Sequence, residues 1–267
     1  QYESDNLQAM GVLYGELRAE GGKPVALDQF AARNMLRNVL KDGLAMRRTT
    51  GVNPFQMGFI GSTDTHNATP GATDEDSFVG HLGQRDGGYR NVQDHFADNP
   101  GGQAVVWAEE NSRDAIFAAI RRKETYATSG TRPVVRFFGG YDFDPGLCES
   151  ADLVSQGYAR GVPMGGSLGV AAPGDAPVFV VSAVKDPGAR GREGNDLQRI
   201  QMIKGWLDGE GNTHEQVLDV AGAADNGAWV DAASCEPTGM GAGSLCAVWR
   251  DEGFDPAQDA FYYARVL

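Results

Sequence analysis

The residues of this chain best suited to chemistry lie in the short segment Gly61-Ser62-Thr63-Asp64-Thr65-His66. In an extended chain, side chains two residues apart point to the same side, so the Asp64 carboxylate and the His66 imidazole would converge. A converging carboxylate and imidazole are suitable ligands for Zn²⁺, Mn²⁺ or iron. The segment therefore predicts a divalent transition-metal site at Asp64 and His66. The alternative is a turn carboxylate beside a solvated histidine, since such a triplet also arises by chance.

Two predicted elements would position this segment. Asp28 can cap a helix that runs to about Arg48, because apolar residues recur along it at spacings of three to five. After a break at Gly51-Val52-Asn53-Pro54, the apolar run 55–61 is typical of a short buried strand that ends in polar residues. In α/β barrels and open sheets the reactive site lies at the carboxyl ends of strands. This order of elements predicts an α/β fold for the first part of the chain.

Further candidate residues lie outside that motif. Residues 67 to about 103 are predicted to form a long loop, and structureless stretches of this length are usually functional. His81 and His95 lie in this loop and are candidates for a general acid or a substrate contact, although solvated loop histidines would give the same pattern. Arg132 is a candidate for binding an anionic substrate oxygen, or else a salt-bridge residue. His214, in a hairpin-like turn, is interpreted as structural or exposed.

A second helix and a strand are predicted to complete the α/β part. Ser112 can cap the helix, Asp114 lies in its first turn, and Arg121-Arg122-Lys123 closes it with charges that suit the helix dipole. Residues 125–128 follow as a strand. The α/β part is thus predicted to cover residues 1–131.

From residue 132 onward the pattern changes to short β-rich runs separated by Gly-rich turns, and helical spacing is nearly absent. Evenly spaced short strands are typical of a β-sandwich. Residues 132–267 are therefore predicted to form an all-β, sandwich-like domain, with Trp206, Trp229 and Trp249 in its core or rim. The predicted strands are 134–138, 178–184, 197–207, 216–220, 244–249 and 261–266.

The composition argues against several classes of protein. The chain has 267 residues, with 23 Lys and Arg against 36 Asp and Glu and a formal net charge of -13, whereas nucleic-acid and anionic-membrane binders need a basic surface. No stretch approaches the roughly 18 apolar residues that span a bilayer. The three cysteines, Cys148, Cys235 and Cys246, lack the spacing of a zinc site. A Cys235–Cys246 disulfide and three buried thiols both stay open.

Several blocks resemble a known superfamily. The segment 61–67, followed by the helix and strand of 110–130, resembles the last quarter of the polymerase-and-histidinol-phosphatase (PHP) superfamily. In that superfamily a late Asp-x-His supplies two metal ligands, and a helix and a strand ending in Thr/Ser-Gly close a distorted (βα)₇ barrel. Residues 135–143, 245–251 and 261–267 look like the C-terminal hallmarks of one PHP-like branch, the DUF3604 family. The resemblance covers nearly the whole chain and implies the closing part of such a barrel followed by the sandwich-like domain.

This resemblance implies a metal-dependent phosphoesterase, in which a metal-activated water attacks the phosphoester of a small molecule. PHP proteins also use an early His-x-His, an acid and further histidines as ligands. This chain has 4 histidines and no His-x-His, and both of its ends look cut. The resemblance therefore implies a C-terminal portion that is inactive or nearly so alone. Its multinuclear site would be completed by an N-terminal barrel segment that this chain lacks.

Two other interpretations stay open. In one, the β-rich domain is a non-catalytic binding or assembly module, and the N-terminal segment is its docking base. In the other, the chain is a complete single-metal hydrolase, which requires His81 or His95 close to His66. The substrate, the oligomeric state and the compartment, export included, are left open by the sequence.

Overall fold

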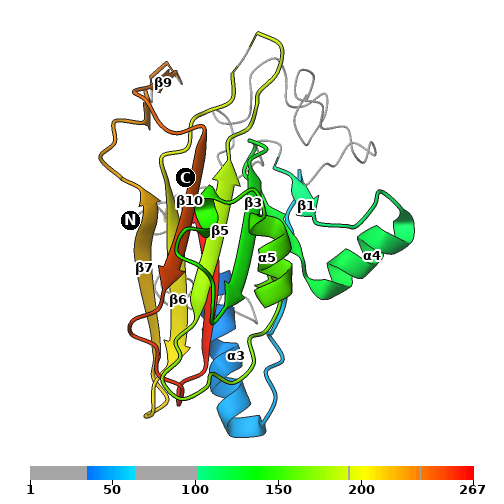
Figure 1. Cartoon of the computed structure of the whole chain (residues 1–267), viewed down its shortest axis with the longest axis vertical. Helices are drawn as coiled ribbons and strands as arrows, with labels where there is room; N and C mark the ends of the chain where they lie inside the picture. Colours follow the sequence, from blue (N-terminus) through cyan, green and yellow to red (C-terminus); the bar gives the residue numbers. More distant parts are fainter. Residues whose placement is uncertain (1–34, 64–101, 192, 232, 235) are drawn as a thin grey trace, which may run out of the picture. The chain divides into compact units, whose positions relative to one another are not determined.

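The computed structural model describes residues 35–63 and 102–267, except residues 192, 232 and 235 (Figure 1). The chain divides into two compact units. The smaller unit contains the described part of residues 1–56 together with 204–215 and 257–261, and the larger unit contains the described part of the rest. Strands predominate over helices in the described residues, which confirms a β-rich fold. None of the described helices is long and apolar enough to cross a membrane.

The smaller unit contains helix α3 (Leu36–Thr50), which agrees with the described part of the helix predicted over 28–48. The helix ends at Gly51, whose φ of 81° is in the left-handed region that favours glycine. Gly43 costs helix propensity, but a Cβ at this position would collide with Oδ1 of Asn53. The glycine therefore lets the chain after the helix fold back closely against it.

Two sheets form most of the β-rich part. A four-stranded antiparallel sheet has the order β10-β5-β3-β4, and a three-stranded sheet has the order β11-β6-β7. Each of the six predicted strands has a counterpart, and the bounds of β5 agree at both ends. The strands are β3 (Val134–Gly140), β4 (Gly161–Pro163), β5 (Val178–Val184), β6 (Arg199–Leu207), β7 (Thr213–Gly222), β10 (Ser244–Arg250) and β11 (Ala260–Val266). A short hairpin of β8 (Trp229–Val230) and β9 (Pro237–Thr238) follows β7.

The two sheets share one hydrophobic core in the larger unit. Both sheets contribute side chains to a single cluster, so they pack face to face as the layers of a sandwich do. The cluster contains Val135, Val181, Ala183, Leu197, Ile200 and Ala247, with Val220, Ala221, Ala264 and Val266 packed against it. The described residues contain no closed barrel, so the PHP-like barrel stays a prediction.

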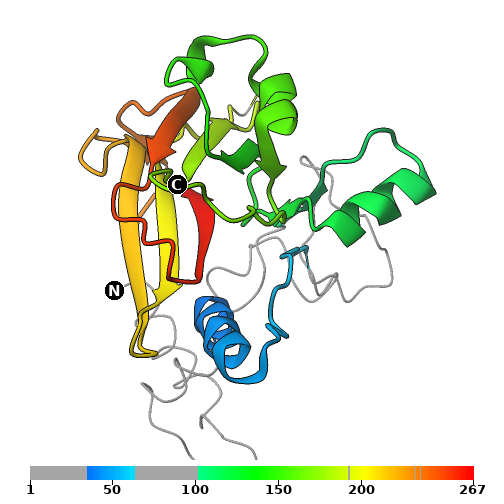
Figure 2. The ribbon, with the colours of Figure 1, turned by 60° about the horizontal axis from the view of Figure 1, so that its bottom comes forward.

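The opposite side of the four-stranded sheet, here called the outer face, has its own cover. The 3₁₀-helix η2 (Leu147–Glu149) and helix α5 (Leu153–Arg160) lie over it, and Phe138 of β3 is buried beneath α5 (Figures 1 and 2). The predicted near-absence of helices after residue 132 is wrong at α5. This helix has only 8 residues, and Gly157 interrupts its pattern. A Cβ at Gly157 would lie 2.6 Å from the Phe138 ring, so the glycine is there for packing.

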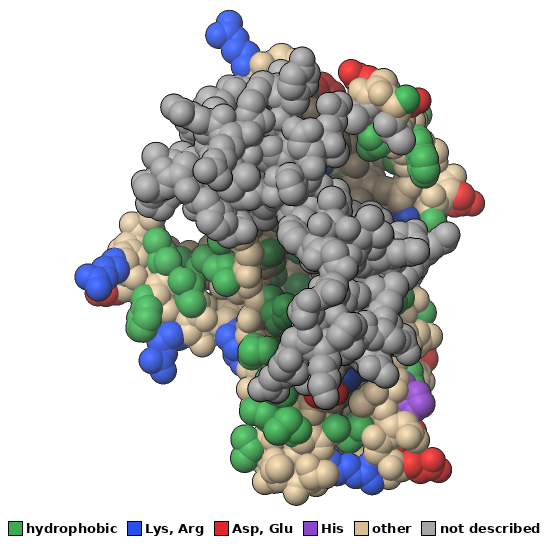
Figure 3. Space-filling view, turned by 180° about the vertical axis from the view of Figure 1, so that it is seen from behind, with side chains coloured by type: hydrophobic (Ala, Val, Ile, Leu, Met, Phe, Trp, Pro, Cys, Tyr) green, Lys and Arg blue, Asp and Glu red, His purple; other side chains and the backbone are tan. Residues whose placement is uncertain are grey.

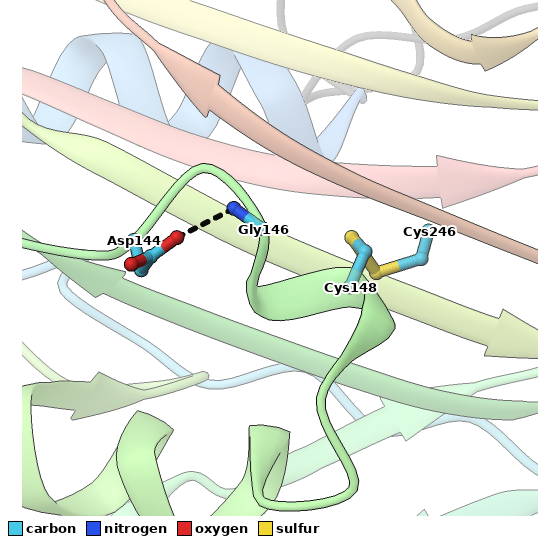
Figure 4. Close-up of a disulfide and its surroundings, with 4 residues drawn as sticks. All are labelled: Asp144, Gly146, Cys148 and Cys246. Atoms are coloured by element: carbon cyan, nitrogen blue, oxygen red, sulfur yellow. Dashed lines mark hydrogen bonds between the residues drawn. A yellow bond between two sulfur atoms is a disulfide. The ribbon is translucent and has the colours of Figure 1, made fainter.

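A disulfide bond joins η2 to β10 across the outer face (Figure 4). Cys148 and Cys246 are bonded, with their Cα atoms 5.7 Å apart. A cysteine forms only one such bond. The Cys148–Cys246 bond therefore rules out both interpretations left open by the sequence, a Cys235–Cys246 disulfide and three buried thiols. The register of β10 places Cys246 opposite Ser182 on the outer face, where η2 passes. The two cysteines are separated by 98 residues in the sequence, so local sequence patterns could not predict their pairing.

Candidate functional site

The segment 57–63, which leads directly to the Asp64-Thr65-His66 motif, runs beside strand β2 (Thr125–Ala127) in the larger unit. Oγ1 of Thr125 donates a hydrogen bond of 2.6 Å to the carbonyl of Phe59. A Cβ at Gly58 would lie 2.5 Å from Cβ of Lys123, and one at Gly61 would lie 3.1 Å from Cβ of Ala127. Residues 58, 59 and 61 thus contact residues 123, 125 and 127 in that order, so the residue numbers rise together along the two segments. The segment and β2 therefore run parallel, as strands joined by a long crossover do.

This segment only partly matches the predicted strand 55–61. Residues 54–55 form a turn, and residues 56–63 have no regular secondary structure. Met57 and Ile60 are 43% and 52% exposed, so the prediction of a buried strand is wrong for them. Thr63, by contrast, is buried. The contact with β2 includes a threonine hydroxyl and two closely approaching glycines, Gly58 and Gly61.

Strand β1 (Ala104–Val106) pairs with β2, and the sequence did not predict it. The pairing is antiparallel, with Ala104 opposite Ala127. It continues beyond β2, because N–H of Gln103 donates to Oγ1 of Thr128 at 2.9 Å and N–H of Thr128 donates to the Gln103 carbonyl at 3.0 Å. We call Thr63, Gln103 and Thr128 the site edge. It is the carboxyl end of β2 and of the parallel segment, and Asp64 is the next residue of the chain after Thr63.

Helix α4 (Arg113–Arg122) lies in the crossover and agrees closely with its prediction. Oγ of Ser112 accepts from N–H of Ala115 at 3.2 Å, Asp114 lies in the first turn, and two arginines lie in the last. Ala119 of this helix is fully buried, whereas Ile120 is 44% exposed. The chain leaves the helix through Lys123, whose φ of 63° is left-handed, and enters β2 directly.

A buried carboxylate fixes the start of β2. Glu124 is 2% exposed, and its carboxylate accepts from the Tyr158 hydroxyl and, at 3.4 Å, from Arg122. Burial, followed by the hydrogen bond to Glu124, raises the pKa of the Tyr158 hydroxyl. Arg136 in turn donates to the Tyr158 oxygen at 3.2 Å. The network links the crossover to β3 and α5 and leaves the buried charge paired.

The structure describes some of the predicted site residues and not others. Asp64, His66 and His81 lie outside the described residues, as does His95. Arg132 is half-buried, and its backbone N–H donates at 2.7 Å to the carboxylate of the buried residue Asp186. Within residues 35–63 and 102–267, no group of three or more His, Cys, Asp or Glu side chains is arranged to hold a metal.

His214 lies in the smaller unit and is exposed, as predicted. Its Nε2 donates to Oδ2 of Asp208 at 2.7 Å, and its ring stacks on Trp206 with centroids 5.1 Å apart. Trp249 is half-buried and stacks near Phe179, as expected of a sandwich tryptophan. Trp229 on β8, in contrast, is 69% exposed.

Comparison with protein-family models matches residues 17–267 to the family described as "Protein of unknown function (DUF3604)". The chain belongs to the DUF3604 family. For this DUF3604 chain, the match includes the segment 57–63, the crossover helix and both sheets of the β-rich part. Comparisons with curated proteins and with solved structures gave no match.

Three residues of the described part of this DUF3604 chain escaped the sequence reading. Asp186 stands in Lys185-Asp186-Pro187-Gly188, a recognisable turn signal, and its Oδ1 accepts from Gly188 N–H at 2.8 Å. Glu124 could have been noticed as an acid between a basic helix end and a strand. The position of Arg136 over Trp107 has no local signal, because their contact depends on how β1 and β3 come together.

Proposed function

We propose that this DUF3604 chain supplies part of the active site of a metal-dependent phosphoesterase, with Asp64 and His66 as metal ligands. The observation that carries the proposal is the parallel course of residues 57–63 and β2, because their carboxyl ends then meet at the site edge. Reactive residues of α/β folds collect at such edges. The Asp-x-His motif begins at the residue after Thr63, which is buried in this edge.

The donor set of the motif fits a divalent transition metal. Carboxylate oxygen and imidazole nitrogen are both ordinary ligands of Zn²⁺, Mn²⁺ and iron. When bound, such a metal lowers the pKa of a coordinated water and neutralises charge on a phosphoryl group. Two ligands do not complete a coordination sphere, so the proposal includes a multinuclear site finished by an N-terminal barrel segment.

Residues of the chain itself would organise the edge around the substrate. Backbone and hydroxyl groups of Gln103 and Thr128 lock the two chain segments together there. The backbone of Arg132 is anchored to Asp186, which would help to hold its guanidinium near the edge for a phosphate oxygen. His81 stays a weaker candidate for a general acid or a substrate contact.

Exposed apolar residues of the crossover region support a covering partner. Met57, Ile60, Phe117 and Ile120 are 43%, 52%, 60% and 44% exposed, although an α/β layer normally buries such side chains. In Figure 3 green hydrophobic side chains lie among blue basic ones at the left of the view, where α4 projects. A barrel segment packed against these residues would bury them.

The test measures metal content and turnover of the intact parent protein. Asp64→Asn and His66→Gln should each lower the bound metal per chain and abolish hydrolysis of 4-nitrophenyl phosphate. His214→Gln is the matched control, because His214 is exposed in the smaller unit and should leave both quantities unchanged. Unchanged metal content and turnover in the Asp64 and His66 variants would contradict the proposal and favour the binding-module interpretation.

A further inference from the structure

The outer face of the four-stranded sheet continues beyond its helical cover. Side chains alternate between the two faces of a strand, and Phe138 of β3 and Val180 of β5 belong to the covered cluster. Arg136 and Val134 therefore point to the same face as Phe138. The register places Ser182 opposite Arg136, and Val184 opposite Val134. These four residues form two rows of the outer face beyond Phe138 and Val180. Ser182 is also opposite Cys246 of β10, whose disulfide bond attaches η2.

The guanidinium of Arg136 is held in place by neutral groups. It lies over the Trp107 ring, 3.2 Å from the ring centroid, and donates to the Tyr158 oxygen at 3.2 Å. Trp107 is itself fixed, because its Nε1 donates to the Val135 carbonyl at 3.0 Å. A guanidinium stacked on an indole loses little further freedom when it binds a ligand.

The remaining N–H groups of Arg136 have no partner in the described part of the chain. These N–H groups are not buried, because the described residues contain only one buried side-chain nitrogen or oxygen without a hydrogen bond, and it belongs to Arg199. They are therefore open to solvent. No described carboxylate forms an ion pair with Arg136; Glu124 is connected to it only through the Tyr158 hydroxyl. The guanidinium presents an unused, preoriented set of donors.

Two exposed valine side chains lie next to the Arg136 guanidinium on the outer face. Val134 and Val184, paired across β3 and β5, are 45% and 47% exposed. The Ser182 hydroxyl lies between them and the covered part of the outer face, opposite Arg136, and no hydrogen bond engages it in the described residues. A guanidinium, a hydroxyl and an apolar surface thus stand together within two rows of one sheet.

We propose that Arg136, Ser182, Val134 and Val184 form a binding site for a small organic oxyanion, a carboxylate or a phosphate monoester with an apolar substituent. The guanidinium donates bidentate hydrogen bonds to two oxygens of the anion, and the Ser182 hydroxyl donates to one of them. The apolar substituent packs on Val134 and Val184. The guanidinium end of this site lies away from the site edge. Trp107, on which the guanidinium stacks, follows β1, and its backbone N–H donates to the backbone carbonyl of Glu124 at 3.0 Å. Trp107 therefore lies at the end of β2 opposite to the site edge.

The test titrates the full chain with benzoate and phenyl phosphate, and with acetate and inorganic phosphate as probes that lack an apolar group. Binding is followed by the Arg136 Nε–Hε NMR signal, identified by its absence in Arg136→Lys. Benzoate or phenyl phosphate should shift this signal saturably and bind more tightly than its small counterpart. The better of the two probes then identifies the oxyanion. No saturable shift with either aromatic probe would overturn the proposal.

Two variants and a control assign the contacts. Arg136→Lys keeps a cation but loses the fork, so it should weaken the preferred probe about tenfold or more in calorimetry. Val184→Ser should weaken the aromatic probe about threefold and leave the small anion unchanged. Arg250→Lys makes the same chemical change at an exposed site on β10 and should have no effect. Equal weakening by Arg136→Lys and Arg250→Lys would contradict a defined site. The wild-type NMR titration decides the matter even if a variant is unstable.

Discussion

At the scale of single residues, Asp208 shows how one side chain can organise a turn in the smaller unit. Its carboxylate accepts from N–H of Glu210 at 2.9 Å, from N–H of Asn212 at 2.8 Å and from Nε2 of His214 at 2.7 Å. These donors favour the charged form, with His214 as the largest influence, and hold the Asp208 pKa well below its usual range. The turn between β6 and β7 therefore depends on an ionised aspartate.

Asp208→Asn should destabilise the protein in a pH-dependent way. A carboxyl whose pKa is lower in the folded chain adds stability above its unfolded pKa of about 3.9 and loses it as the pH falls further. The melting temperature of the variant should thus lie below that of the wild type at neutral pH, and the gap should narrow as the solution is acidified below about pH 4. Thermal unfolding at a series of pH values measures the gap. A gap independent of pH would show that the charge does not matter.

The contacts of residues could be predicted from the sequence only where they are local. The Ser112 cap needs Ala115 three residues away, and it was predicted correctly. The cation over Trp107 needs a residue from β3, which only the folded sheet brings near. The disulfide of Cys246 has the same origin, because strand register, rather than chain distance, selects Cys148.

At the scale of elements, length and continuity of the apolar pattern separate what was predicted from what was missed. β5 is apolar except for Ser182 and is buried on both faces over its first four residues, and both of its bounds were predicted. α5 and β1 have 8 and 3 residues, too few to establish a period. The segment 57–63 has the composition of a buried strand, but the described residues leave Ile60 half-exposed. Composition indicates that a segment can be buried; its neighbours decide whether it is.

Gly157→Ala should destabilise the protein, although alanine is the better helix former. In an open helix this change would stabilise by about 1 kcal/mol. Here the new methyl group would press on the Phe138 ring, and overpacking of this kind costs about 1–3 kcal/mol. Urea unfolding measures the sign of the change. Gly169→Ala serves as the control, since a Cβ there has no neighbour within 4 Å and should be neutral. Stabilisation by Gly157→Ala would mean that α5 does not pack on β3 as described.

At the scale of the whole molecule, long-range pairing limits what the sequence can predict. The four-stranded sheet orders its strands as β10-β5-β3-β4, so β5 lies beside β10 and β3, although other strands separate it from each of them in the chain. The β-rich character and strand positions follow from local composition, whereas strand order and the shared core do not. For the candidate site, the sequence predicted the motif, and the structure adds the parallel course of the segment before it.

Replacing both bonded cysteines should destabilise the protein substantially. The Cys148–Cys246 bond closes a loop with a sequence separation of 98 residues. In the chain-entropy account a loop of this size is worth about 4–5 kcal/mol. The Cys148→Ser/Cys246→Ser double variant should lose stability of this order in urea unfolding, whereas Cys235→Ser should unfold like the wild type. Equal stability of the double variant, or a peptide map in which Cys235 carries the bond, would contradict the described pairing.

The same bond has a consequence for how the chain withstands proteases. The loop closed by Cys148 and Cys246 contains β4 to β9, a large part of both sheets. A single cut anywhere in residues 149–245 leaves both fragments covalently attached, so the nicked protein keeps its mass until a reductant is added. Resistance to fragmentation is thus built into the connectivity of the chain and does not require that its loops resist cleavage.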